Sequence, residues 1–250
     1  MMLVAAGASD CGRRRRRNED RFLLRADLGL FAVADGMGGH TAGEVAAQLS
    51  VEEIEKTVEE GRRGSSGAGS ARADASDSLV RAITSAHFRL GEAVADNRRL
   101  RGMGATIVIA LVERNSGLVT LAHVGDSRAY LMHEAELSRL TSDHSWVEEQ
   151  IAAGVLSPEA ARSHPMKNDV TRALGGRREP VVDVRQARLA TGDHLVLCSD
   201  GLNAMLQDEE IGTIIASSQD VRMLADRLIA EANRKGGLDN ITVVAVQAVV

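Results

Sequence analysis

The sequence predicts an α+β layered sandwich, because its strands and helices occur in groups rather than in strict alternation. Short runs of Val, Ile and Leu have the length of buried strands, and two longer segments carry apolar residues at helical spacing. This grouping favours a layered sandwich over a doubly wound parallel sheet. No internal repeat and no linker-like composition interrupts the 250 residues, so we expect residues 1–250 to form a single domain.

Nine short apolar runs are predicted as strands, since each is followed or preceded by a turn residue or a charged segment. In chain order they are Leu3–Ala6, Arg21–Arg25, Leu30–Ala34, Thr106–Glu113, Leu118–Val124, Ala129–His133, Val182–Ala187, His194–Ser199 and Ile241–Val249.

Two amphipathic helices are predicted between the third and fourth strands, over Ala42–Glu60 and Ser78–Asp96. Between them, Gly61–Ala75 is rich in Gly, Ser and Arg and lacks apolar periodicity, which predicts a mobile loop. The remaining predicted helices are Trp146–Ala153, Pro158–Arg162, Glu209–Ala216 and Asp220–Asn233.

The composition is that of an ordinary globular protein, with 44% hydrophobic and 26% charged residues. A net charge of −5 argues against nucleic acid as the main partner. The chain has no run of about 18 apolar residues and no secretory signal, so we expect a cytoplasmic protein without direct membrane insertion. Cys11 and Cys198 have neither disulfide nor metal-ligand spacing, and we expect both to be buried thiols.

Acidic residues stand where predicted strands meet a glycine or a turn. Asp35, Asp126 and Asp200 each follow a strand, Asp239 precedes one, and Glu19 lies just before another. A single Asp-Gly pair is usually only a turn. Repeated placement at strand ends instead predicts carboxylates that converge on one sheet edge. Such a cluster of oxygen ligands suits a hard cation such as Mg²⁺, Mn²⁺ or Ca²⁺.

Eight short motifs combine these acidic residues with Gly, Arg and Thr. They are Gly12–Asp20, Asp35–Glu44, Gly102–Thr106, Gly125–Tyr130, Leu140–Ser145, Thr171–Gly175, Cys198–Leu202 and Gly236–Thr242. In this order they resemble the metal-dependent protein serine/threonine phosphatases of the PPM family (the type 2C class), in the compact bacterial form. The resemblance implies a four-layer α-β-β-α sandwich, with two central antiparallel sheets flanked by helix pairs. It also implies a small helical flap at about residues 145–176.

The resemblance implies two Mn²⁺ or Mg²⁺ ions in a core site. Asp35 would bridge both ions, and the Gly36 carbonyl would bind the second. Asp200 and Asp239 would hold the first ion, and Glu19 would help to hold the second, partly through water.

Further roles are implied for residues around this core. Asp20 would contact the metal ions through water or through another ligand, and Asp126 would bind a third, weaker metal together with Asp200. Arg15 matches the phosphate-binding arginine of the family, and its guanidinium suits bidentate capture of phosphate. For protonation of the leaving alcohol, His40 and a metal-bound water are both open alternatives.

The implied activity is hydrolysis of phosphoserine and phosphothreonine in proteins, by in-line attack of a metal-bridged hydroxide. Its partners would be phosphorylated proteins, including a bacterial serine/threonine kinase and its substrates. The alternatives are a catalytically inactive phosphatase-like binding or regulatory protein, an enzyme directed at an anti-sigma partner, and a hydrolase of small phosphate esters.

The arginine run Arg13–Arg17 contains four arginines besides the phosphate-binding candidate. They are interpreted either as a solvated basic rim or as a surface that attracts phosphorylated, acidic protein segments. A nucleic-acid arm is the weakest of the three interpretations.

Overall fold

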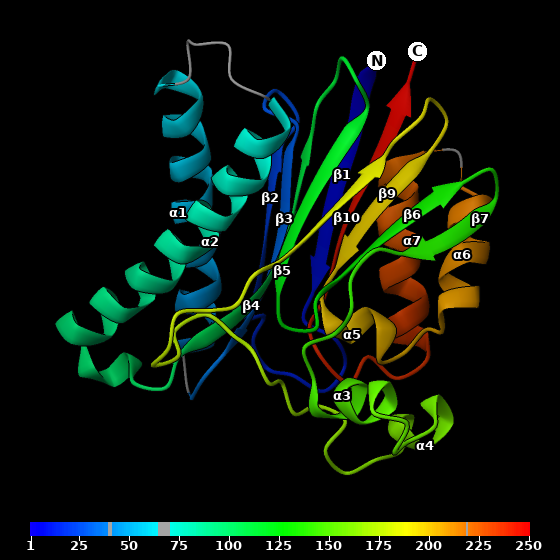
Figure 1. Cartoon of the computed structure of the whole chain (residues 1–250). Coiled ribbons are helices and arrows are strands. Elements are labelled where there is room, and N and C mark those ends of the chain that lie inside the picture. Colours follow the sequence, from blue (N-terminus) through cyan, green and yellow to red (C-terminus); the bar gives the residue numbers. More distant parts are fainter. Residues whose placement is uncertain (40–41, 65–70, 219) are drawn as a thin grey trace.

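Two five-stranded antiparallel sheets stack at the centre of the molecule, and helices cover both outer faces (Figure 1). The structure is a computed structural model and describes residues 1–39, 42–64, 71–218 and 220–250. The predicted four-layer α-β-β-α sandwich is confirmed.

The two sheets are named sheet I and sheet II, and all their neighbouring strands run antiparallel. In spatial order, sheet I contains β1 (Met2–Asp10), β10 (Ile241–Val249), β9 (His194–Cys198), β6 (Arg128–His133) and β7 (Glu136–Arg139). Sheet II contains β2 (Asp20–Arg25), β3 (Leu30–Met37), β4 (Gly104–Val112), β5 (Leu118–Val124) and β8 (Asp183–Arg188).

The helices form two outer layers and a small group at one end of the sheets (Figure 1). α1 (Ala42–Gly64) and α2 (Ala71–Asp96) cover sheet II, whereas α6 (Asp208–Ala216) and α7 (Val221–Arg234) cover sheet I. The short elements are η1 (Arg98–Leu100), α3 (Trp146–Ala152), α4 (Pro158–Arg162) and α5 (Asp200–Asn203). No described helix combines the length and the apolar character that a membrane span requires.

Alternation along the strands divides the core into three apolar layers. On β3, Leu30, Ala32 and Ala34 pack against the helices. Phe31 and Val33 pack between the two sheets. Because successive side chains point to opposite faces, the next residue of the second set, Asp35, lies on the face between the sheets.

All odd-numbered strands end, and all even-numbered strands begin, at the same end of the sandwich. The chain passes between the sheets there through residues 11–19, residues 125–127 and the segment that carries α3 and α4. Both termini lie at the opposite end (Figure 1). This end therefore collects the strand ends and loops on which the predicted site residues lie.

Two predictions about local structure were wrong. The loop predicted over Gly61–Ala75 is shorter, because α1 continues to Gly64 and α2 begins at Ala71; residues 65–70 lie outside the described part of the chain. Strand β7 was missed because its two-residue hairpin turn, Glu134–Ala135, has positive φ at both residues without the usual Gly or Asn. That the chain forms one domain with a flap at residues 145–176 stays a prediction.

Candidate metal centre

The predicted acidic residues come together at the loop-bearing end of the sandwich. Asp20 and Asp35 are direct cross-strand partners on β2 and β3. Asp126 follows β5, Asp200 begins α5 directly beyond β9, and Asp239 precedes β10. The sequence predicted that these carboxylates converge on one sheet edge; in the structure they lie where the ends of the two sheets meet, which we call the seam. The group formed by Glu19, Asp20, Asp35, Asp126, Asp200 and Asp239 is called the acidic centre.

Asp20 is buried and joins the two sheets across this seam. The Ser199 hydroxyl donates to Asp20 Oδ2 at 2.7 Å, and the Thr242 backbone N–H donates to the Ser199 Oγ at 3.0 Å. Asp20 Oδ1 is buried without a hydrogen-bond partner. Ser199 was not singled out from the sequence, although it directly precedes Asp200 in a predicted motif.

Burial and mutual repulsion disfavour the charged forms of these carboxyl groups. Burial raises the pKa of Asp35 well above its ordinary value, and Asp20 and Asp200 raise it further. Burial raises the pKa of Asp20 to about 7, and burial together with Asp239 raises the pKa of Asp200 to about 6. Burial and Asp200 likewise raise the pKa of Asp126. A cation among these groups would relieve both effects.

Glu19 and Gly36 present oxygens toward one small space at the start of α1. A Cβ atom placed on Gly43 would lie 2.7 Å from the Gly36 carbonyl oxygen and 2.8 Å from Glu19 Oε1. Any side chain there would collide with both oxygens, so glycine at position 43 keeps this space open. Glu19 Oε1 is buried and has no hydrogen-bond partner.

Arg15 and Asp239 form an ion pair at the rim, with Arg15 Nη2 2.6 Å from Asp239 Oδ2. The neighbouring Asn240 fixes the loop that carries Arg15: its side-chain Nδ2 donates to the carbonyl oxygens of Cys11 at 3.0 Å and Arg17 at 2.8 Å. Its Oδ1 accepts from the Glu19 backbone N–H at 2.8 Å. The sequence did not predict this role of Asn240, and only its position inside the last motif signalled it.

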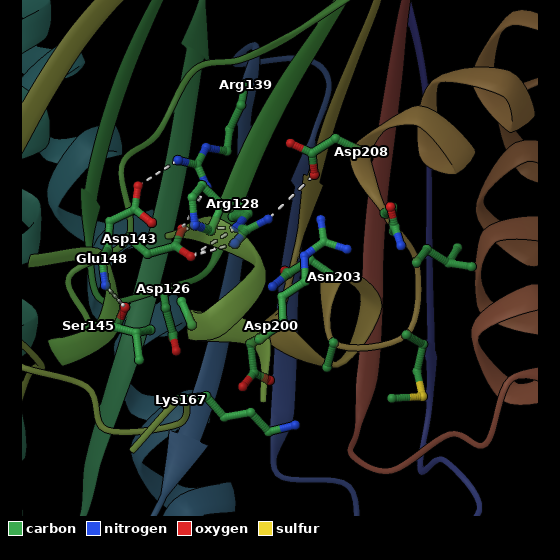
Figure 2. Close-up of a pocket in the computed structure, with 18 of the residues that line it drawn as sticks. Asp126, Arg128, Arg139, Asp143, Ser145, Glu148, Lys167, Asp200, Asn203 and Asp208 are labelled. Atoms are coloured by element: carbon green, nitrogen blue, oxygen red, sulfur yellow. Dashed lines mark hydrogen bonds and ion pairs between the residues drawn. The ribbon is translucent and has the colours of Figure 1, made fainter. Parts of the chain in front are cut away.

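A pocket of about 570 Å³ extends from Asp126 and Asp200 to the short helices α3 and α4 (Figure 2). Its lining combines acidic and basic side chains, among them Lys167 and Asp208, with apolar residues such as Ile151. Asp126 and Asp200 thus line both the acidic centre and this pocket.

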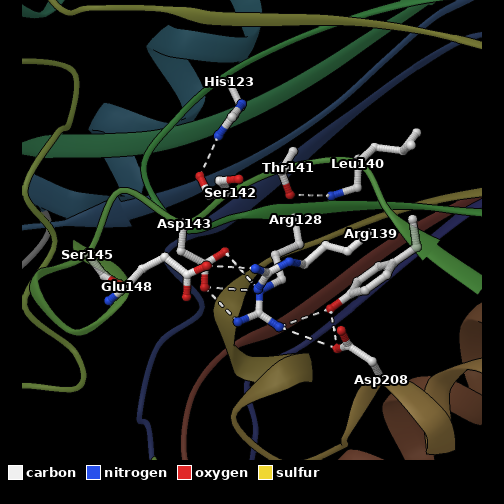
Figure 3. Close-up of polar contacts among 12 residues, drawn as sticks. His123, Arg128, Arg139, Leu140, Thr141, Ser142, Asp143, Ser145, Glu148 and Asp208 are labelled. Atoms are coloured by element: carbon white, nitrogen blue, oxygen red, sulfur yellow. Dashed lines mark hydrogen bonds and ion pairs between the residues drawn. The ribbon is translucent and has the colours of Figure 1, made fainter. Parts of the chain in front are cut away.

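A fully paired charge network lies on one wall of this pocket (Figure 3). Arg128 donates from Nε to Asp143 Oδ1 at 2.9 Å and from Nη2 to Asp143 Oδ2 at 2.6 Å. Arg128 also donates from Nη1 to the Tyr130 hydroxyl at 3.1 Å, which donates to Asp208 Oδ1 at 2.9 Å. These bonds tie β6 to the segment before α3 and to the start of α6.

A second polar cluster, His123, His144 and Asp183, offers three ligand atoms within 4.8 Å of one another; it is the only such group found among the described residues. Its geometry argues against a metal site. The two imidazole rings stack at 4.5 Å with an interplanar angle of 16°, and Arg172 Nη1 lies 3.2 Å from His144 Nε2 and 2.9 Å from Asp183 Oδ1. The guanidinium thus already supplies the positive charge.

One smaller expectation needs correction, and one falls outside the structure. Cys198 is buried as predicted, but Cys11 is partly exposed because it lies in the loop beyond β1. For His144, which stands just before a predicted helix, the sequence favoured a capping or packing role over catalysis; the structure shows packing, because His144 is buried against His123 while Ser145 caps α3. His40 lies outside the described residues.

The residues of the acidic centre fit a hard divalent cation. Three carboxylate oxygens, Glu19 Oε1, Asp20 Oδ1 and Asp200 Oδ1, are buried without a hydrogen-bond partner. Oxygen-only ligands of this kind are typical of Mg²⁺ and Mn²⁺ sites.

Comparison with known proteins gives consistent results. The family model for protein phosphatase 2C matches residues 9–239. Serine/threonine protein phosphatase PstP of Mycobacterium tuberculosis is 40% identical over all of this chain, which spans only 46% of that protein. Protein phosphatase PhpP of Streptococcus pneumoniae is 35% identical, with 95% of this chain and 94% of PhpP covered.

Solved structures agree over the whole fold. The crystal structure of the M. tuberculosis phosphatase PstP/Ppp superposes with a TM-score of 0.87 at 36% identity, with both chains fully covered. A crystal structure of the PstP catalytic domain, in complex with two manganese ions, has a TM-score of 0.83 at 36% identity and covers 99% of each chain.

The four-layer sandwich, with an acidic centre at the seam of its two sheets, defines the class of metal-dependent protein phosphatases. Within this class, the chain belongs to the protein phosphatase 2C family.

Proposed function

We propose that this chain hydrolyses phosphoserine and phosphothreonine in proteins, using Mn²⁺ or Mg²⁺ at the acidic centre. The observation that carries the proposal is the group of buried carboxylate oxygens without hydrogen-bond partners at the seam. The two manganese ions in the PstP catalytic domain support the same assignment.

The predicted ligands would divide between two ions. Asp35 would contact both; Asp200 and Asp239 would hold one, and the Gly36 carbonyl with Glu19 the other. Asp126, with Asp200, would hold a third, weaker ion. Divalent ions, when bound, supply positive charge that stabilises the phosphoryl oxygens and makes water more acidic.

The protein's own groups position this set. Ser199 donates to one oxygen of the Asp20 carboxylate, and the other oxygen is buried without a hydrogen-bond partner, which leaves it available to a metal-bound water. Gly43 keeps the space between Glu19 and the Gly36 carbonyl free. Asp20 and Asp126 are buried, so charge interactions of these two carboxylates are strengthened relative to bulk water.

Arg15 would bind the substrate phosphate. Its side chain is about half exposed, and among the described residues its guanidinium forms an ion pair only with Asp239. Rotation away from Asp239 would let the guanidinium contact two phosphoryl oxygens at once. We expect Arg15→Ala to raise KM for a phosphothreonine peptide roughly tenfold, the loss of about one charge-assisted contact. An unchanged KM would contradict this role.

The remaining parts of the proposal rest on the family resemblance. The substrates would be those of a serine/threonine kinase, in the cytoplasm. Residues 1–250 would act as one phosphatase domain, with the flap at residues 145–176 forming the outer wall of the pocket beside Asp126.

The decisive experiment measures hydrolysis of a phosphothreonine peptide by chelator-treated protein, before and after addition of Mn²⁺ or Mg²⁺. We expect activity only with the metal, and its loss in Asp35→Asn. Asp226→Asn makes the same chemical change on the exposed face of α7 and should retain full activity. If folded protein stays inactive with every divalent ion, the chain is a phosphatase-like binding protein instead.

A further inference from the structure

Five consecutive arginines, Arg13–Arg17, form the chain segment that crosses from sheet I to sheet II at the rim of the acidic centre. All five are exposed. Arg15 pairs with Asp239, but within the described residues Arg13, Arg14 and Arg16 form no ion pair. Burial raises the pKa of Glu19, and the positive charge of Arg17 is one of the smaller effects that lower it.

The backbone of this arginine run is held in place from both sides. The Gly12 N–H donates to Asp10 Oδ1 at 2.8 Å, and the Arg13 N–H donates to the Gly237 carbonyl at 2.7 Å. The Arg17 carbonyl accepts from Asn240 Nδ2 at 2.8 Å. The guanidinium groups therefore extend from a fixed path beside the centre rather than from a loose tail.

The charge of the run opposes that of the molecule. The chain carries a formal net charge of −5, whereas this segment carries five positive charges in succession. Such a local field attracts anionic groups and acts over a Debye length, about 8 Å at physiological salt. In an extended peptide, residues two to four positions from the phosphorylated one lie about 7–14 Å away from it. Flanking residues of a bound phosphopeptide would thus reach the run.

We propose that Arg13, Arg14, Arg16 and Arg17 bind acidic or additionally phosphorylated residues that flank the phosphoserine or phosphothreonine to be hydrolysed. This inference rests on the proposed function and names its substrate class: phosphoproteins with clustered negative charge. Arg15 binds the phosphate itself, and its neighbours select the surrounding sequence.

Nucleic acid fits the same surface less well. Aromatic residues make up only 2% of the chain, so the stacking platforms of single-strand binding proteins are scarce.

The test compares two phosphothreonine peptides that differ only in their flanks, with three Glu in one and three Gln in the other. Initial rates with Mn²⁺ give kcat/KM for each peptide. We expect wild-type protein to prefer the acidic peptide, and Arg14→Ala/Arg16→Ala to lower that preference roughly fivefold, mainly through KM, since exposed charge pairs contribute little each. Raising the salt concentration should lower the wild-type preference as well.

A matched control removes two exposed arginines far from the centre, in Arg63→Ala/Arg222→Ala. These residues lie at the ends of α1 and α7 opposite to those that border Gly36 and Arg13. We expect the preference of this variant to equal that of the wild type. An equal loss in both double variants would show a general charge effect and overturn the proposal.

Direct binding separates this inference from the proposed function. Labelled copies of both peptides are titrated into Asp35→Asn protein, with and without the two arginine substitutions. The inference is supported if the acidic peptide binds more tightly than the neutral one and if this difference disappears when Arg14 and Arg16 are replaced, even if no peptide is hydrolysed. Equal binding of both peptides overturns it, and so does a single-stranded oligonucleotide of the same charge that binds more tightly than the acidic peptide.

Discussion

The acidic centre and the Arg128 network lie on neighbouring strand ends, but their charged side chains differ in whether they have partners of opposite charge. In the network, each charged group has a partner: Asp143 accepts three hydrogen bonds from Arg128, and the Arg128 and Asp143 side chains are only 16% and 9% exposed. In the centre, carboxyl groups face one another and several of their oxygens have no partner.

The pairing of buried charges therefore distinguishes charged residues that stabilise the fold from charged residues that serve a binding site. A buried ion pair balances its desolvation with attraction and can hold elements together. Buried carboxylates that repel one another weaken the fold, so their presence indicates that a cation is to be bound there. The two regions therefore should respond oppositely when a charge is removed.

The largest effect is expected in the acidic centre, on phosphatase activity. Asp239→Asn should lower metal-dependent phosphatase activity at least about a hundredfold, because a predicted metal ligand loses its charge. The protein should stay folded, since Asp239 is partly exposed, its ion pair is with the exposed Arg15, and an amide oxygen can still accept the hydrogen bond from the Asn240 backbone N–H. Activity assays and thermal unfolding of the same sample check both points. Near-native turnover would remove Asp239 from the site.

In the Arg128 network, Arg128→Met should lower the free energy of unfolding by about 3 kcal/mol, because Asp143, only 9% exposed, then keeps just the longer ion pair with Arg139 Nη1, at 3.9 Å, among the described residues. Urea denaturation with and without the substitution measures this loss. Arg128→Met/Asp143→Asn should recover part of it, since no buried charge then remains unpaired. A double variant less stable than Arg128→Met would show that the pairing explanation is wrong.

The pH dependence of stability should also reveal the unpaired carboxylates. In metal-free protein the pKa values of Asp20 and Asp200 are raised from 3.8 to about 7 and about 6. The folded state therefore binds more protons than the unfolded state between pH 4 and 7, and stability is lost as the pH rises through this range. We expect a loss of a few kcal/mol by pH 8, measured by denaturation with a chelator present.

Two controls sharpen this experiment. Asp20→Asn should flatten the pH profile, and Mn²⁺ should restore stability at pH 8 by binding only the folded state. A metal-free protein that becomes more stable from pH 5 to 8 would contradict the raised pKa values.

The smallest effect is expected at an ion pair on the pocket wall that is more exposed than Arg128–Asp143. Arg139 Nη2 lies 2.7 Å from Glu148 Oε1, and both side chains are about one-quarter exposed (27% and 26%). Glu148→Gln should therefore change the free energy of unfolding by less than about 1 kcal/mol. A loss as large as that of Arg128→Met would mean that exposure does not separate these two pairs.

Much of the fold was predictable where an apolar run ends at, or begins after, a residue that favours turns. β5 ends just before Gly125 and β10 begins just after Asn240, and both were predicted with their observed bounds. β7 was not predictable, because its turn uses Glu and Ala in a backbone conformation that sequence rules reserve for Gly and Asn. The last turn of α1, up to Gly64, was missed because good helix formers such as Arg also occur in polar loops.

For the candidate site, the sequence indicated which residues matter but not how they contact one another. Asp35 and Asp200 stand out because each follows an apolar run directly. The pairing of Arg15 with Asp239, and of Asp20 with Ser199, joins residues more than 170 positions apart. Contacts of that kind follow from sheet topology, which local patterns do not specify.

The order of strands in sheet I has a consequence for synthesis of the protein. β10 pairs on one side with β1 and on the other with β9, so a nascent chain that stops before Ile241 leaves two strand edges without a partner. Asp239 also arrives only at that point. The acidic centre can therefore assemble only after β10 has been synthesised, and products truncated before Asp239 should lack the complete centre and be prone to associate through their open edges.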